Sequence, residues 1–135
     1  MFKDTAGQED LTRAIIGCGV RVHEMWGPGL LESIYKECLV IELHADGHRT
    51  DKSRKLRLVY KGHDLKTDFW PDLVVDDSVV VELKAVEKIA PVHKAQVITY
   101  LKLTGLPVGL LMNFNVPLLQ QGVHRLVRPD LLLRT

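Results

Sequence analysis

Two acidic residues in the middle of the chain are spaced so that they meet across a β-hairpin. Alternating apolar residues predict one strand over residues 66–75 and a second over residues 79–86. The segment 76–78, Asp-Asp-Ser, is then a three-residue hairpin loop. With that loop length, Asp72 on the first strand lies directly opposite Glu82 on the second.

Two carboxylates that face each other repel and destabilise a sheet, so a positive charge is required to offset them. Lys84 is one source of that charge, because it lies two residues from Glu82 on the same face. An internal ion pair with Lys84 would be a purely structural solution. A divalent cation is the other source, since Mg²⁺ is commonly held by one or two carboxylates together with water and substrate phosphate. The residues alone leave both interpretations open.

The rest of the chain supplies elements to position this hairpin. Apolar residues at helical spacing predict three helices, and shorter apolar or alternating runs predict further strands. The predicted helices cover residues 8–25, 30–45 and 91–104, and the predicted additional strands cover residues 56–60, 108–112 and 123–127. The order is helix, helix, three strands, helix, strand, strand, which indicates an α/β domain with a mixed sheet.

Composition limits the class of protein. A chain of 135 residues with 46% hydrophobic and 26% charged residues is typical of one globular domain. It has no apolar run of the length needed to cross a membrane, and its first ten residues lack the apolar segment of a signal peptide. The two cysteines, Cys18 and Cys38, are too few and too far apart for a disulfide scaffold. We therefore expect a cytoplasmic protein without a membrane partner.

Charge is unevenly distributed although the net charge is only +1. Residues 48–66 carry a net +5 and residues 91–135 a net +4, whereas residues 1–47 and 67–90 each carry −4. An acidic centre between basic segments suits a cation site that faces a polyanion, although charges that merely cover exposed faces give the same pattern. The basic stretch contains three candidate phosphate contacts, Arg54, Lys55 and Arg57.

Two motifs carry a resemblance to a known family. Pro71-Asp72, followed after nine residues by Glu82-Leu83-Lys84, resembles the signature of the PD-(D/E)xK nucleases. The run Gly29-Leu30-Leu31-Glu32-Ser33-Ile34-Tyr35 is similar to the motif that names the GxxExxY family, which is assigned to the same nuclease superfamily. The resemblance extends from about Ile15 to Val127. It implies a single domain over residues 1–135, with a restriction-endonuclease-like αβββαβ core over about 8–127 and an extra N-terminal helix.

The resemblance also implies a role for each residue at the expected site. The carboxylates of Asp72 and Glu82 and the backbone carbonyl of Leu83 would bind Mg²⁺ or Mn²⁺, and the metal would activate a water molecule. Lys84 would orient that water or stabilise the developing negative charge.

Three residues on the predicted helices complete the expected site. Glu32 would add an acidic group near the metal, although an acid in the first helical turn also favours the helix dipole and can pair with Lys36. Gln96 and Tyr100 are four residues apart and resemble the QxxxY pattern of RecB-type nucleases. Gln96 would bind the water or a ligand carboxylate, and Tyr100 a phosphate; packing in the core is the alternative for Tyr100.

The expected function is that of a metal-dependent nuclease that hydrolyses phosphodiester bonds in DNA or RNA. The competing hypotheses are a nucleic-acid-binding module that keeps the fold but does not cut, and a protein-interaction domain in which the carboxylates and Lys84 form a closed ion network. A homodimer is a further expectation, because an enzyme that cuts both strands of a duplex needs two active sites.

Overall fold

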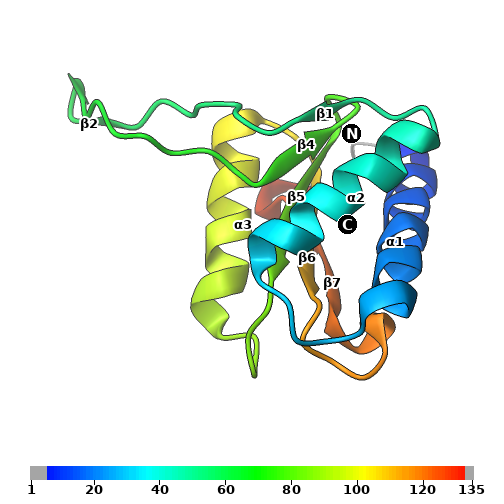
Figure 1. Ribbon diagram of the computed structural model, residues 1–135. Coiled ribbons are helices and arrows are strands. Elements are labelled where there is room, and N and C mark those ends of the chain that lie inside the picture. Colours follow the sequence, from blue (N-terminus) through cyan, green and yellow to red (C-terminus); the bar gives the residue numbers. More distant parts are fainter. Residues whose placement is uncertain (1–5, 133–135) are drawn as a thin grey trace.

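The computed structural model describes residues 6–132 and shows a mixed five-stranded sheet packed between helices (Figure 1). The elements are α1 (Ala6–Trp26), α2 (Glu32–Ala45), β1 (Thr50–Asp51), β2 (Val59–Tyr60), β3 (His63–Asp64), β4 (Leu73–Val75), β5 (Val79–Lys84), α3 (Pro91–Thr104), β6 (Val108–Asn113), the 3₁₀ helix η1 (Leu119–Gly122), β7 (Val123–Val127) and α4 (Pro129–Leu132). The three long helices and the predicted strands at 108–112 and 123–127 are confirmed. None of the described helices combines the length and apolarity needed to span a membrane.

The sheet has the strand order β1-β4-β5-β6-β7, and β5 occupies its centre. β5 pairs antiparallel with β4 and parallel with β6, and the other pairs are antiparallel. The parallel crossover from β5 to β6 passes through α3, as this connection requires. Every residue of β6 and all but the last residue of β5 are buried. Such continuous apolar strands are expected where helices cover both faces of a sheet.

Alternation along the strands divides the core into two parts. Side chains of one face, including Val81 and Leu83, pack with α1 and α2, whereas Val74 and Val80 on the other face pack with α3. Figure 1 shows the corresponding layers, with α1 and α2 on one side of the sheet and α3 on the other. Glu82 has the same parity as Val80, so its side chain belongs to the face that α3 covers.

The prediction of a half-buried sheet strand over residues 56–60 is wrong. Of the alternating residues there, Leu56 is buried, but Tyr60 is largely exposed. These residues leave the body as one leg of a projecting ribbon, and the strand that pairs with β4 is instead β1. The predicted strand over residues 66–75 is likewise reduced to β4 in the sheet, because its first part forms the returning leg of the ribbon. Local alternation describes a strand but does not say which sheet it joins.

Tyr35 holds together the connection between α1 and α2. Its hydroxyl donates a hydrogen bond to the carbonyl of Gly27 at 2.5 Å and accepts one from the N–H of Leu30 at 3.2 Å. Its ring is fully buried and stacks on Phe114 with the ring centroids 4.6 Å apart. The last residue of the GxxExxY motif is therefore a core residue that fixes where α2 begins.

Replacing Tyr35 by phenylalanine is expected to lower the free energy of unfolding by about 1–2 kcal/mol, because two backbone groups lose their partner while the ring still packs. Urea denaturation of Tyr35→Phe and wild type measures this difference. Tyr60→Phe removes a hydroxyl from an exposed ring and serves as the control, with a change within about 0.5 kcal/mol. Equal stability of Tyr35→Phe and wild type would contradict the assigned role.

Candidate active site

The carboxylates of Asp72 and Glu82 lie where β4 separates from β5. Val75 is paired with Val79 and Leu73 with Val81, so the predicted register and the predicted loop over 76–78 are both confirmed. Continuing that register by one residue places Asp72 opposite Glu82. β5 runs on past this point beside β6, so Glu82 stays within the sheet while the chain at Asp72 leaves it.

Where β4 and β5 separate, carboxylate side chains take the place of the backbone-to-backbone hydrogen bonds of the sheet. The backbone N–H of Asp72 donates to Oε1 of Glu82 at 2.6 Å, and the N–H of Leu83 donates to Oδ2 of Asp72 at 2.9 Å. Each carboxylate thus binds the backbone of the opposite strand, which fixes both groups in place. The second bond brings the backbone N–H of Leu83 against the Asp72 carboxylate.

The two acids differ in burial. Glu82 is only 4% exposed, whereas the side chain of Asp72 is 34% exposed. Burial and then the neighbouring Asp72 carboxylate raise the pKa of Glu82 to about 7, against weaker opposing effects from the N–H of Asp72 and from Lys84 and Lys36. The lysines thus offset the combined effect of burial and repulsion only in part, and a cation between the carboxylates would relieve the repulsion.

The donor set suits a divalent cation that prefers oxygen. Carboxylate and carbonyl oxygens are the ligands of Mg²⁺, which retains several water molecules and needs only one or two carboxylates from a protein. Within residues 6–132, no cluster of three or more His, Cys, Asp or Glu side chains has the arrangement of a metal site. The residues thus fit a hydrated hard cation and do not form a closed zinc-type cage.

Lys84 and Lys36 approach the carboxylates from different elements. Lys84 ends β5, is half-buried and acts electrostatically on Glu82. Lys36 comes from α2, and its Nζ lies 4.0 Å from Oδ1 of Asp72. Lys36 was not predicted as a site residue, because in the sequence it pairs with Glu32 one turn away. No spacing within the helix marks its place at Asp72, since that place depends on how α2 crosses the sheet.

Glu32, by contrast, is not brought into the carboxylate pair. It opens α2, is half-buried and makes no hydrogen bond or ion pair to another described residue. It also does not complete a three-ligand cluster with Asp72 and Glu82. Its position in the first turn suits the helix dipole, which was the structural alternative.

Gln96 and Tyr100 lie on the face of α3 that covers this side of the sheet. Tyr100 is buried, and its ring lies 5.1 Å from the ring of Phe69, measured between centroids. Burial, followed by the nearby Glu82 and Asp72 carboxylates, raises the pKa of the Tyr100 hydroxyl, while a hydrogen bond from Gln96 acts in the opposite direction. Gln96 also lines a cavity of about 390 Å³ beside Phe69 and His93. The structure therefore brings both residues toward the carboxylates and makes Tyr100 part of the core.

The three basic candidates are already engaged in ion pairs. Arg54 contacts Asp51 at 3.3 Å and Asp77 at 2.5 Å, at the end of the hairpin opposite the carboxylates. Lys55 contacts Asp68 at 3.1 Å, and Arg57 contacts Asp64 at 3.0 Å, both on the projecting ribbon. Asp77 is five residues from Asp72, which is roughly 16 Å along a strand. Arg54 is thus held away from the carboxylates, whereas Lys55 and Arg57 belong to a separate basic surface.

A comparison with protein families identifies the kind of domain that holds this site. Residues 9–126 match the model of the PD-(D/E)XK nuclease superfamily. The chain belongs to that superfamily. The matched region includes the hairpin with Asp72, Glu82 and Lys84 and the helix with Gln96. No curated protein and no solved structure matches the chain. Membership accounts for the α/β fold with its mixed sheet and indicates nuclease chemistry, a nucleic-acid substrate and use of a divalent metal.

The raised pKa of Glu82 makes a prediction for stability without metal. The folded protein binds a proton on the Glu82 carboxylate more tightly than the unfolded chain does. The stabilising contribution of this proton to the folded state is therefore fully present below about pH 4.5 and is lost as the pH rises toward 7. The free energy of unfolding should fall by at most about 3 kcal/mol over that range on account of Glu82.

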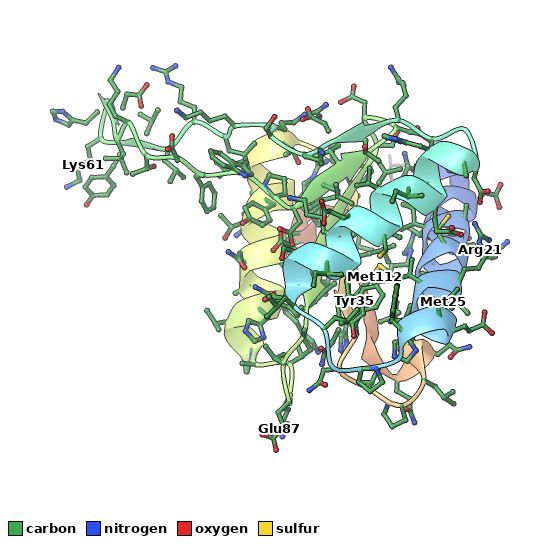
Figure 2. The ribbon with its side chains drawn as sticks, viewed as in Figure 1. Arg21, Met25, Tyr35, Lys61, Glu87 and Met112 are labelled. Carbon is green, nitrogen blue, oxygen red and sulfur yellow. The ribbon has the colours of Figure 1, made fainter. Side chains whose placement is uncertain are left out.

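The measurement is a series of urea titrations in EDTA from pH 4.5 to 8. Glu82→Gln should remove this component, so that the variant gains stability relative to wild type as the pH increases. Glu87→Gln, which changes an exposed acid in the loop after β5, is the matched control and should follow wild type (Figure 2). Parallel pH profiles for wild type and Glu82→Gln would contradict the assignment.

Proposed function

We propose that this protein is a metal-dependent nuclease that hydrolyses phosphodiester bonds in DNA or RNA, with Mg²⁺ or Mn²⁺ as its cofactor and DNA as the first substrate to test. The single observation that carries the proposal is the opposed pair Asp72 and Glu82, whose charge the nearby lysines offset only in part. The motif from Gly29 to Tyr35 supports assignment to the GxxExxY group, with a single domain over residues 1–135 whose core covers about residues 8–127.

Each residue has a distinct part in this proposal. Asp72, Glu82 and the carbonyl of Leu83 would hold the cation. Bound there, the metal would lower the pKa of a coordinated water and neutralise charge on the scissile phosphate. Lys84 supplies a fixed positive charge beside Glu82 for the negative charge that develops on phosphate oxygens. Gln96, held against Tyr100, offers an amide that can orient the attacking water.

Lys36 also has a part in this scheme. Its ammonium group lies 4.0 Å from Oδ1 of Asp72 and partly neutralises that carboxylate. The same ammonium group would offer a positive charge to a substrate phosphate bound beside Asp72. Glu32, which has no partner among the described side chains, could bind an outer-shell water from the start of α2.

The first test is titration of Mg²⁺ and Mn²⁺ by calorimetry together with cleavage assays. Wild type should bind the metal and cleave at least one of single-stranded DNA, duplex DNA, branched DNA and RNA. Asp72→Asn and Glu82→Gln should lose both properties, because each removes one of the two charged ligands. Glu87→Gln should retain both. Absence of metal binding by wild type, even with nucleic acid present, would overturn the proposal and leave a closed ion network.

Lys84→Gln separates metal binding from catalysis. This substitution should keep the affinity for Mn²⁺ within a few-fold but lower kcat by roughly 10²–10³, since a preorganised charge near the transition state is removed. Lys88→Gln, which changes an exposed lysine in the following loop, is the matched control and should retain full activity. A normal kcat in Lys84→Gln would show that Lys84 is only a structural counter-ion.

The oligomeric state depends on the substrate in this proposal. Cutting both strands of a duplex requires two active sites and hence two copies of the chain. Light scattering with and without duplex should then give the mass of a dimer if double-strand breaks are formed.

A further inference from the structure

We propose that the projecting ribbon, residues 52–70, is a binding arm for single-stranded nucleic acid that leads into the carboxylate site. This inference rests on the proposed function for its substrate class, and it assigns the form of that substrate. Figure 1 shows the arm leaving the body of the molecule beside α3, and Figure 2 shows Lys61 at its far end. The arm returns to the body through Trp70 and Pro71, directly before Asp72.

Backbone hydrogen bonds join the two legs of the arm. The N–H of Leu56 bonds to the carbonyl of Phe69 at 2.7 Å, and the N–H of Leu65 bonds to the carbonyl of Leu58 at 3.0 Å. At the tip, Lys61 and Gly62 have φ values of 47° and 80°, as in a two-residue type I′ turn between β2 and β3. The base is anchored because Leu56 is buried and Phe69 packs against Tyr100. The base of the arm is therefore held against the α3 side of the sheet.

Its charge matches a polyanion. Residues 52–70 contain six lysines and arginines and two aspartates, a net charge of +4 in a chain whose total is +1. Between the two legs lies a pocket of about 360 Å³ lined by three cations and a hydroxyl, from Lys55, Arg57, Lys66 and Thr67. Asp64 also lines this pocket and pairs with Arg57, and Lys55 pairs with Asp68. Lys66 is therefore the lysine of the pocket that has no ion pair among the described side chains. Such a pocket suits a phosphate group.

Exposed aromatic rings favour a single strand over a duplex. Tyr60 is 63% exposed at the tip, and Trp70, two residues before Asp72, is 41% exposed at the base. Val59 and Leu65, one on each leg, are also exposed. Duplex backbones are bound by cations and hydrogen-bond donors, whereas unpaired bases gain energy by stacking on aromatic rings. The ammonium group of Lys61 lies 5.5 Å from the centre of the Tyr60 ring, which places a cation beside a stacking surface.

The spacing is compatible with one continuous strand. Thr67 in the phosphate pocket is five residues from Asp72, so the pocket and the carboxylates are at most about 18 Å apart along this leg. At 3.4 Å per nucleotide of a stacked strand, this distance corresponds to about five nucleotides, and to fewer in an extended strand. A nucleic-acid strand bound at the Asp72 and Glu82 site would thus place its next few phosphates along the arm.

The test measures binding without cleavage. Fluorescence anisotropy in EDTA compares a labelled oligothymidylate with a duplex of the same length, using the full chain. Wild type should bind the single strand more tightly. Tyr60→Ala and Trp70→Ala should each weaken that binding by roughly 5- to 100-fold, the range for loss of one stacked base. Lys66→Gln should reduce the slope of log K against log salt by about 0.7.

Matched controls use the same residue types elsewhere on the surface. Trp26→Ala removes a tryptophan that is 54% exposed at the end of α1, and Lys102→Gln removes an exposed lysine on α3. Both should bind as wild type does. Tyr60→Phe should also bind normally, because it keeps the stacking ring, and circular dichroism verifies the fold of each variant.

The outcomes separate the two proposals. Tighter binding of the duplex, or unchanged affinity in both Tyr60→Ala and Trp70→Ala, would overturn the arm proposal while leaving the metal and cleavage assays unaffected. Single-strand binding that depends on these residues, in a protein that fails to bind metal, would support the arm and overturn the nuclease. Loss of binding only in the two controls would place the nucleic-acid surface elsewhere and contradict the arm.

Discussion

The electrostatic repulsion between Asp72 and Glu82 is the constraint around which this molecule is built. Each carboxylate accepts a backbone hydrogen bond from the opposite strand, so neither is free to turn away from the other. A purely structural hairpin gains nothing from two acids in register. Burial of Glu82 and, after it, this repulsion raise the pKa of Glu82, since the lysines nearby offset them only in part. A proton, or a cation bound between the strands, would relieve the repulsion.

The surrounding core explains why this arrangement persists. β5 is almost entirely buried and is held between β4 and β6, so Glu82 cannot move outward to water without disrupting the centre of the sheet. α3 packs closely on the same face because β6 has a glycine there: a Cβ on Gly109 would lie 2.7 Å from Cγ1 of Val97. This close approach brings Tyr100 and Gln96 toward the carboxylates. Apolar packing thus supplies the energy that holds the acids together.

The hairpin could be predicted because its information is local. The loop length and the two-residue period together fix which residues face each other, and the helices are marked by strong periodicity and by Gly or Pro at their ends. The arm was not predictable in this way. Leu56, Leu58 and Tyr60 alternate as in a sheet strand, yet only tertiary packing decides that Leu56 is anchored and Tyr60 is exposed.

Positions that depend on packing between elements were equally hard to infer. Lys36 reaches Asp72 because of the angle at which α2 crosses the sheet, and no spacing within the helix encodes that angle. Glu32, one turn away, remains outside the carboxylate pair for the same reason. Arg54 looked like a phosphate contact by charge alone, but Asp51 three residues before it and Asp77 from the β4–β5 loop both pair with it. Charge identifies candidates, whereas the available counter-ions decide which of them remain free for a ligand.

Because the two acids differ in burial, the carboxylate pair is accessible to solvent from one side. Glu82 is enclosed by the sheet and α3, whereas Asp72 is open to solvent at the point where the chain enters from the arm. In the proposed function, a hydrated cation and a phosphate would therefore approach from the side of Asp72. The chain as a whole, with a net charge of +1, exerts little attraction on a polyanion at that distance. The arm, with its charge of +4, ends two residues before Asp72, so the two proposals place attraction of the substrate and its hydrolysis at neighbouring points of the chain.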